Sequence, residues 1–329
     1  MNVRGLFAWA VALLACALGY AGEPVTLSGR AMGTTWLVKY RGNAEVEAVR
    51  QRVADRLEAL ENIFSMYRPG SELSRFNRSK STAWIDVSPE MASVAEGSRA
   101  ISEMTGGAFD ATVAPLLALW GFGPQGAVRQ APSGRRLVTA RQLVDYRALE
   151  VRRAPPGLRK TRGNVTADFS SYAKGFAADQ VSDLLQMLGL PDHLVQIGGD
   201  VKTRGPQSWR VGVEKPGEGL ATTLDLASEG ALSTSGNHRN AVEREGRREG
   251  HIVDPHTGRP VVSSVLSVSV IHASCARSSA LATGLYVMGL EAGLAVAERE
   301  GLAVLFLVDE GGIIAPRASD AWLAYTGGK

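Results

Sequence analysis

Cysteine is scarce in this sequence, occurring only at Cys16 and Cys275 among 329 residues. Cys16 lies in an apolar N-terminal run, so cleavage or acylation of that run leaves Cys275 without a partner. No disulfide can then cross-link the chain, which excludes a disulfide-stapled scaffold. A chain of this length must be held together by its hydrophobic core, as one large domain or two tightly joined lobes.

An excess of one charge sign is also missing, since the formal net charge is +3 with 21% charged and 45% hydrophobic residues. This balance excludes a disordered chain and a nucleic-acid-binding tail. The 37 glycines show no G-X-Y period and therefore indicate tight turns and close backbone approaches.

Residues 129–162 hold ten basic and two acidic side chains but almost no aromatic ones, so we expect a solvated arginine-rich excursion and no nucleic-acid partner. Residues 243–249 alternate in charge sign and are expected to form an exposed loop.

Residues 1–21 are predicted to be an export signal. A basic residue precedes an apolar run of 12 residues, Leu6 to Ala17, which is too short for a membrane-spanning helix. A lipoprotein signal that leaves a lipid on Cys16 is the alternative to simple cleavage. We expect an exported, periplasmic protein whose functional domain is 22–329, with anchoring to the inner membrane through Cys16 as the alternative. No later segment is expected to span a membrane.

Hydrophobic periodicity predicts a mixture of strands and helices. Strands are expected at 34–40, 193–197, 209–213, 265–271 and 302–308. Helices are expected at 46–60 with Asn43 as N-cap, from Ser88-Pro89 to Gly106-Gly107, at 174–188 and at 276–288. A Gly198-Gly199 turn is expected to join 193–197 to 209–213. Because the elements follow no βαβ rhythm and no repeat occurs, the pattern favours an α+β fold.

Familiar catalytic motifs are absent: the sequence contains no P-loop, no strand followed by G-x-G-x-x-G, no H-E-x-x-H and no G-x-S-x-G. Five small-residue runs remain, and their backbone N–H groups suit either a phosphate-bearing ligand or ordinary turns. They are 31–35, 106–112, 168–175, 233–236 and 251–258. Cys275 is expected to be a packed small side chain. His251 and His256 flank an Asp-Pro turn, which does not suit a zinc-binding helix, and a structural and a catalytic role for His251 both remain open.

Taken in order, these runs resemble the ApbE family, the FAD:protein FMN transferases. The matching segments are Met32–Thr34, Ser65–Asn77, Gly107–Thr112, Leu119–Phe122, Asp168–Asp179, Gly198–Asp200, Trp209–Val211, Thr234–Gly236 and His251–Gly258. The resemblance implies an α+β, T-fold-like domain with mixed or antiparallel sheets and packed helices. It also implies Mg²⁺-dependent transfer of FMN from FAD to a Thr or Ser hydroxyl of an exported or membrane redox protein, with release of AMP.

The resemblance also implies which residues form the site. FAD would contact Met32, Tyr67, Ala108, Phe109, Asp110, Asp168, Lys174 and Ile252. His251 is the candidate general base, since histidine exchanges a proton near neutral pH. The candidate metal ligands are Ser279, Thr283 and the carbonyl of Ser171. The backbone at six glycines is expected to approach FAD, namely Gly33, Gly107, Gly175, Gly199, Gly236 and Gly258.

One departure from the family concerns the metal. The family's metal-binding helix usually reads Asp-Ala-x-x-Thr, whereas this chain has Ser279-Ala-Leu-Ala-Thr283. Mg²⁺ prefers charged oxygen ligands, so its affinity should drop, and Ser279→Asp should raise affinity and activity. No acid nearby in the motif compensates, since Glu291 lies about three turns further along. The open outcomes are an active enzyme with a weaker metal site, a non-catalytic FAD-binding maturation factor, or an introduced substitution. An FAD pyrophosphatase that gives FMN and AMP is a further reading.

Overall fold

The computed structural model describes residues 23–126, 128, 130–217, 219–237, 241–244 and 247–328. The predicted export signal at 1–21, including Cys16, lies outside the described residues. Within them, Cys275 is a free, buried cysteine, as expected.

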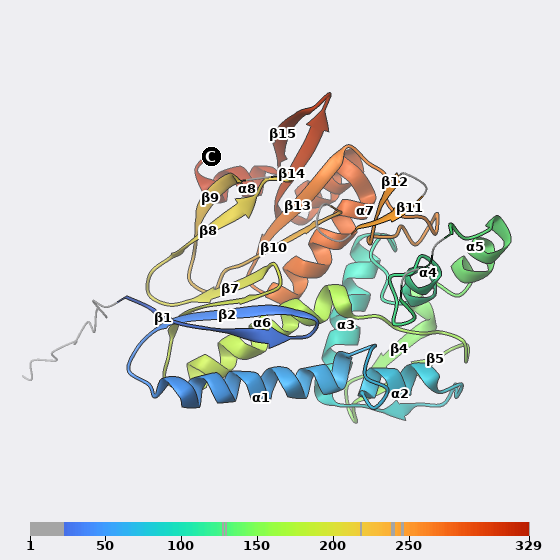
Figure 1. The fold of residues 1–329 in the computed structure, drawn as a ribbon, viewed down its shortest axis with the longest axis horizontal. Helices are drawn as coiled ribbons and strands as arrows, with labels where there is room; N and C mark the ends of the chain where they lie inside the picture. The colour runs from blue at the N-terminus through green and yellow to red at the C-terminus, as the bar shows by residue number, and fades with distance from the viewer. Residues whose placement is uncertain are drawn as a thin grey trace, which may run out of the picture.

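The domain is built on an eight-stranded sheet (Figure 1). In spatial order its strands are β1 (Val25–Ala31), β2 (Thr34–Arg41), β6 (Asp192–Ile197), β7 (Asp200–Arg204), β10 (Ala231–Gly236), β13 (Val265–His272), β14 (Ala303–Glu310) and β15 (Ile313–Ala318). Neighbouring strands of this sheet run antiparallel. The expected α+β class is confirmed.

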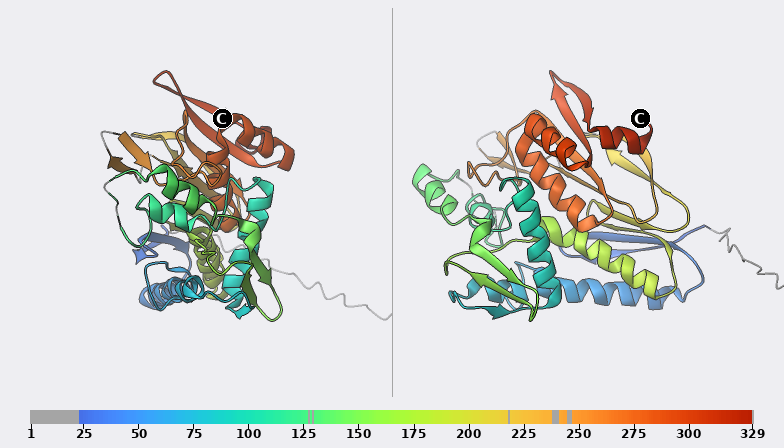
Figure 2. Two further views of the ribbon diagram at one scale, coloured as in Figure 1. Left: turned by 90° about the vertical axis from the view of Figure 1, so that its right-hand side faces the viewer. Right: turned by 180° about the vertical axis from the view of Figure 1, so that it is seen from behind.

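Four long helices lie on one side of this sheet, as Figure 2 shows from behind. They are α1 (Val46–Phe64), α3 (Pro89–Met104), α6 (Ser170–Met187) and α7 (Cys275–Glu300). Helix α6 packs on β6 and β7, α7 packs on β10 and β13, and the two helices contact each other. The large core between helices and sheet therefore has α6 and α7 at its centre.

The opposite face of the sheet is covered by the hairpin of β8 (Trp209–Glu214) and β9 (Leu220–Leu226) and by α8 (Asp320–Thr326). Strand β14 shows why both faces are apolar. Val304 and Phe306 belong to the helix-side core, whereas Leu305 and Leu307 belong to the core under the hairpin. Successive side chains of a strand point to opposite faces, so a strand covered on both sides is apolar throughout.

Smaller elements complete the domain. They are α2 (Glu72–Arg78), β3 (Ile85–Asp86), α4 (Ala114–Leu119), α5 (Gly134–Arg141), a 3₁₀ turn (Tyr146–Ala148), β4 (Leu149–Arg152), β5 (Gly157–Lys160), β11 (Ala241–Arg244) and β12 (Arg247–Gly250). Strands β11 and β12 pair with each other, so the loop expected at 243–249 is instead part of a β-hairpin. Charge alternation does not distinguish a hairpin from a loop, which explains the difference.

The arginine-rich segment folds back onto the domain. Arg152 and Arg159 lie over the ring of Trp84, at 5.0 and 5.1 Å from its centroid. Arg152 also pairs with Asp86 at 2.9 Å. The excess of basic residues in this segment is thus partly balanced by acids from other segments. The segment packs against the domain more closely than the expected solvated excursion.

Most predicted elements are confirmed, with differences at their ends. Glu45 caps α1 in place of Asn43, and α6 begins at Ser170, one turn earlier than expected. The Gly198-Gly199 turn joins β6 to β7, whereas β8 pairs with β9. The expected link from 193–197 to 209–213 is therefore wrong, because the periodicity did not reveal β7.

Helix α7 is longer than predicted, with 26 residues and a break at Gly289, where φ is 77°. It is long and apolar enough to cross a membrane, contrary to the expectation for segments after the signal. Half of its most apolar stretch is buried inside the domain, and the core helix of a soluble protein can have the same length and composition. The helix is apolar because it packs between α6 and the sheet.

Stability should depend on pH through His193, which is fully buried on β6. Its Nδ1–H donates to the carbonyl of Leu190, and its Nε2 accepts from Ser182 Oγ, both at 2.7 Å. Burial lowers the pKa of His193 to about 4, whereas the unfolded chain binds a proton near pH ~6.5. The free energy of unfolding should therefore be greatest above that pH and fall by on the order of 3 kcal/mol as the pH drops toward 4.

Urea denaturation between pH 7.5 and 4 measures this loss. His193→Gln should flatten the slope, whereas His256→Gln, a change at an exposed histidine, should leave it intact. Equal slopes in wild type and His193→Gln would contradict the prediction.

Candidate functional site

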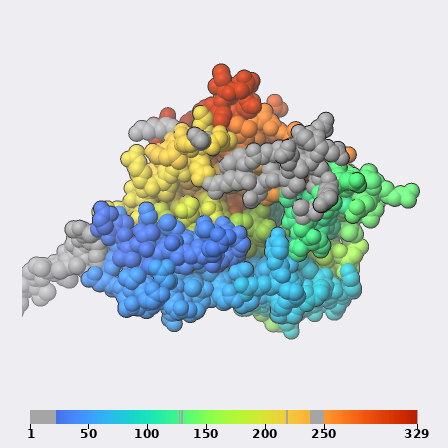
Figure 3. Space-filling view, in the orientation of Figure 1, coloured from blue at the N-terminus to red at the C-terminus, as the bar shows by residue number. Residues whose placement is uncertain are grey.

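The structure brings the predicted site residues together around one cavity of about 950 Å³. This volume is typical of small-molecule and cofactor sites (~300–1,000 Å³). The residues come from six separate segments of the chain and are Met32, Tyr67, Ala108, Phe109, Asp110, Asp168, Ser171, Lys174, His251, Ile252, Ser279 and Thr283. Figure 3 shows one face of the molecule, on which the blue β1–β2 hairpin lies to the left and the green segment around α4 lies to the right.

Met32 reaches the cavity from the tight turn between β1 and β2. Ala31 pairs with Thr34, so Met32 and Gly33 form a two-residue turn, with φ of 53° and 72°. Such a turn matches the twist of a hairpin but is uncommon for a residue with a large side chain. The backbone N–H of Met32 donates to Glu61 of α1 at 3.2 Å, which helps to hold this conformation.

Asp110 is a buried carboxylate whose oxygens are already engaged. One oxygen accepts from the backbone N–H and the hydroxyl of Thr112, at 2.7 and 2.6 Å. The other accepts from the backbone N–H of Tyr146 at 3.0 Å. Burial raises the pKa of Asp110, and these hydrogen bonds oppose the shift. The carboxylate therefore shapes the loop at the cavity wall, which places Ala108 and Phe109 beside the space.

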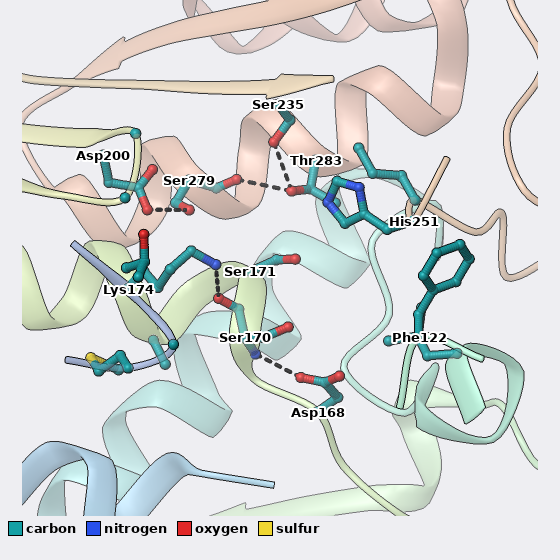
Figure 4. Close-up of a pocket in the computed structure, with 18 of the residues that line it drawn as sticks. Phe122, Asp168, Ser170, Ser171, Lys174, Asp200, Ser235, His251, Ser279 and Thr283 are labelled. Atoms are coloured by element: carbon teal, nitrogen blue, oxygen red, sulfur yellow. Dashed lines mark hydrogen bonds between the residues drawn. The ribbon is translucent and has the colours of Figure 1, made fainter. Parts of the chain in front are cut away.

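The beginning of α6 faces the cavity (Figure 4). Asp168 accepts from the backbone N–H of Ser170 at 2.8 Å, and Lys174 donates to the carbonyl of Ser170 at 3.0 Å. Ser171 lies in the same first turn. A helix N-terminus with a lysine nearby attracts anionic groups such as phosphate.

Helix α7 contributes Ser279 and Thr283, which are one turn apart and share a face. Ser279 Oγ donates to Asp200 at 3.1 Å (Figure 4). Thr283 Oγ1 lies 2.9 Å from Ser235 Oγ and donates to the carbonyl of Ser279 at 3.2 Å. One hydroxyl of α7 thus contacts the carboxylate of Asp200 on β7, and the other contacts a hydroxyl of β10.

As expected, the motif around Ser279 holds no compensating acid, but the structure places Asp200, from another segment, beside Ser279. The expectation considered only neighbours in sequence, whereas Asp200 lies 79 residues away and is brought in by the β6–β7 turn. Burial raises the pKa of Asp200, while Lys174 and the hydroxyls of Ser233 and Ser279 oppose the shift. The Gly198-Gly199-Asp200 motif was the signal in the sequence, but nothing there linked it to α7.

The donor set fits a hard cation such as Mg²⁺. The side chains of Asp200, Ser279 and Thr283 offer only oxygen atoms, which is the ligand type that Mg²⁺ prefers. Within the part of the chain that the structure describes, no three histidine, cysteine, aspartate or glutamate side chains cluster as a metal site. This set carries one negative charge, on Asp200, and the expected loss of Mg²⁺ affinity stays a prediction.

His251, Ile252 and Tyr67 line the remaining wall. Figure 4 shows the imidazole of His251 pointing into the cavity. The backbone N–H of Ile252 donates to Asn237 Oδ1, and its carbonyl accepts from the N–H of Val261. Both backbone groups of Ile252 therefore already have hydrogen-bond partners within the protein. Tyr67 is 70% exposed, which places it at the rim.

Comparison with known proteins agrees with this geometry. The ApbE family profile matches residues 32–306. The chain belongs to the ApbE family. It is 37% identical to the FAD:protein FMN transferase of Vibrio cholerae over 312 residues, which cover 92% of this chain and 93% of that protein. It is 35% identical to the FAD:protein FMN transferase of Escherichia coli strain K12, with 92% of each chain covered.

Solved structures of the family share the fold. The flavin transferase ApbE from Vibrio cholerae superposes with a TM-score of 0.85 at 35% identity, covering 92% of this chain and 99% of that one. The ApbE protein from Thermotoga maritima superposes with a TM-score of 0.82 at 27% identity, covering 92% and 99%.

The glycines expected to approach FAD divide into two groups within this ApbE fold. Gly33, Gly199 and Gly236 line the cavity. Gly175 does not, because it lies where α6 crosses α7: a Cβ there would come within 2.3 Å of the carbonyl of Cys275. Gly107 borders a second, smaller cavity, and Gly258 packs beside Leu137 and Leu116. Three of these six glycines therefore lie outside the cavity lining.

Asp110→Asn should destabilise the ApbE domain. An asparagine amide offers only one acceptor atom, so the N–H of Tyr146 or the donors of Thr112 would lose a partner in a buried place. We expect a loss of about 1–3 kcal/mol in the free energy of unfolding, measured by chemical denaturation. Asp254→Asn, in a more exposed turn, is the control and should cost less. Unchanged stability would mean that Asp110 is not the anchor of its loop.

Proposed function

We propose that this chain is an exported FAD:protein FMN transferase, which moves FMN from FAD to a Thr or Ser hydroxyl of an exported or membrane redox protein and releases AMP. The observation that carries the proposal is the convergence of residues from six chain segments on one cavity, in a chain that belongs to the ApbE family. Export is supported by the basic and apolar pattern of residues 1–21.

The reaction is a phosphoryl transfer. The acceptor hydroxyl oxygen bonds to the phosphorus of the FMN half, the bond from that phosphorus to the bridging oxygen breaks, and AMP leaves. His251 takes the hydroxyl proton, because its imidazole points into the cavity. The first turn of α6 and Lys174 bind the pyrophosphate. Mg²⁺, when bound, neutralises part of the phosphate charge.

A non-catalytic FAD-binding maturation factor is the second candidate, favoured by the neutral Ser279 in place of the family's aspartate. An FAD pyrophosphatase would differ only in that water replaces the acceptor hydroxyl as the attacking group. The presence or absence of a flavin–protein bond separates these activities.

Incubation with FAD, Mg²⁺ and an acceptor protein that carries a Thr/Ser flavinylation motif tests the proposal. We expect the acceptor to keep yellow fluorescence on a denaturing gel and AMP to appear in equal amount. AMP with free FMN would indicate the pyrophosphatase. Intact FAD bound to the protein, not rescued by Ser279→Asp, would indicate the maturation factor.

His251→Ala should slow FMN transfer by about 10²–10⁴-fold, the usual contribution of a general base. FAD affinity, measured by fluorescence quenching, should change much less, because the base acts on the acceptor hydroxyl. His256→Ala is the matched control, since His256 lies five residues on in the same loop and does not line the cavity. Equal losses of transfer and FAD affinity in His251→Ala would recast His251 as structural.

A further inference from the structure

Asp200 lines the cavity, and the proposed reaction gives its carboxylate no role. Asp200 is only 5% exposed, and Ser279 Oγ donates to it at 3.1 Å. Ser279 occupies the position at which the family's metal-binding helix usually has an aspartate. Helix α7 lacks a negative charge at this position, but the carboxylate of Asp200 on β7 lies one hydrogen bond away from Ser279.

The position of Asp200 is set by the sheet. It opens β7 and pairs with Ile197, the last residue of β6, so that Gly198 and Gly199 form a two-residue turn. Gly198 has a φ of 67°, which other residues adopt with difficulty. This tight hairpin leaves Asp200 little freedom to move away from α7.

Asp200 also lacks a close cation within the described part of the chain. Lys174 is the main favourable charge near it, but its ammonium group donates to the carbonyl of Ser170. The nearby hydrogen-bond donors are the neutral hydroxyls of Ser233 and Ser279. A buried carboxylate without a paired cation is costly, and a bound metal ion would supply the missing positive charge.

We propose that Asp200 is the anionic metal ligand of this chain, acting with the hydroxyls of Ser279 and Thr283. The inference rests on the Mg²⁺ dependence in the proposed function. It assigns the negative charge of the metal site to β7 rather than α7. Moving a carboxylate from Asp200 to Ser279 should then preserve the site.

Metal binding can be measured apart from catalysis, with Mn²⁺ as the metal probe and ADP added to supply a diphosphate in place of that of FAD. Free and bound Mn²⁺ are distinguished by electron paramagnetic resonance. Asp200→Asn should weaken Mn²⁺ binding by at least about tenfold, since even outer groups of a metal site cost ~10–100-fold. The double variant Asp200→Asn/Ser279→Asp should restore binding, which also shows that the fold survives.

Asp192→Asn is the matched control. Asp192 is likewise 5% exposed, but it lies at the other end of the β6–β7 hairpin, where it binds Arg41 and Trp209. Its replacement should lower the melting temperature and leave Mn²⁺ affinity unchanged.

Ser279→Asp alone offers a second readout. It places two carboxylates side by side in a buried site, where they repel each other. Its melting temperature should fall in EDTA and recover with Mn²⁺, and its Mn²⁺ affinity should exceed that of wild type.

Unchanged Mn²⁺ binding in Asp200→Asn overturns the inference, as does failure of the double variant to restore it. Transfer of FMN in EDTA by a wild type that binds no Mn²⁺ also overturns it, while the transferase function stands. Conversely, Mn²⁺ binding that depends on Asp200, in a protein that transfers no FMN, supports the inference and removes the proposed function.

Discussion

The close contact between α6 and α7 is the constraint on which the site depends. Gly175 lets the helices approach until its α-carbon lies against the carbonyl of Cys275, and any Cβ there would collide. Asp179 of α6 accepts from the backbone N–H groups of Cys275 and Ala276, at 2.9 and 3.0 Å, and so caps α7. These contacts fix how far α7 lies along α6. The residues of both helices that line the cavity are positioned by this alignment.

Carboxylates inside this protein, buried at Asp110 and Asp200 and half-buried at Asp179, differ in their hydrogen-bond donors. Asp110 and Asp179 accept from backbone N–H groups, which satisfies them and fixes a loop and a helix end. Burial raises the pKa of Asp179, and these hydrogen bonds oppose the shift. Asp110 and Asp179 each also accept from a hydroxyl group, of Thr112 and Ser274 respectively. The donors to Asp200 are the hydroxyls of Ser233 and Ser279 without a backbone N–H among them, so Asp200 does not fix a loop or a helix end in this way.

Other reactive residue types are kept inert by the same packing. Cys275 is buried at the start of α7, and burial raises the pKa of its thiol well above the ordinary value, so no thiolate forms. His193 is held neutral by its burial, which lowers its pKa to about 4, and its two hydrogen bonds satisfy both ring nitrogens. Polar chemistry is thus concentrated where the β6–β7 turn, β10, α6 and α7 meet, and the surrounding core excludes it elsewhere.

Local signals in the sequence were enough for much of the fold. The spacing of apolar residues predicted β2, α1 and β14, because amphipathic periodicity reflects which face is buried. Partner choice between strands was not predictable in the same way, and β8 was assigned to the wrong neighbour. Pairing depends on contacts between distant segments, to which short-range patterns are blind.

The sequence by itself determined the family, the α+β class and twelve of the residues that line the cavity, because motifs in a preserved order retain the identity of each loop. Only the tertiary structure decided what those residues touch. It turned Asp110 toward its own loop, assigned Gly175 to helix packing and brought Asp200 to Ser279. The physical reason is that a hydrogen bond acts over about 3 Å in space, whatever the separation along the chain.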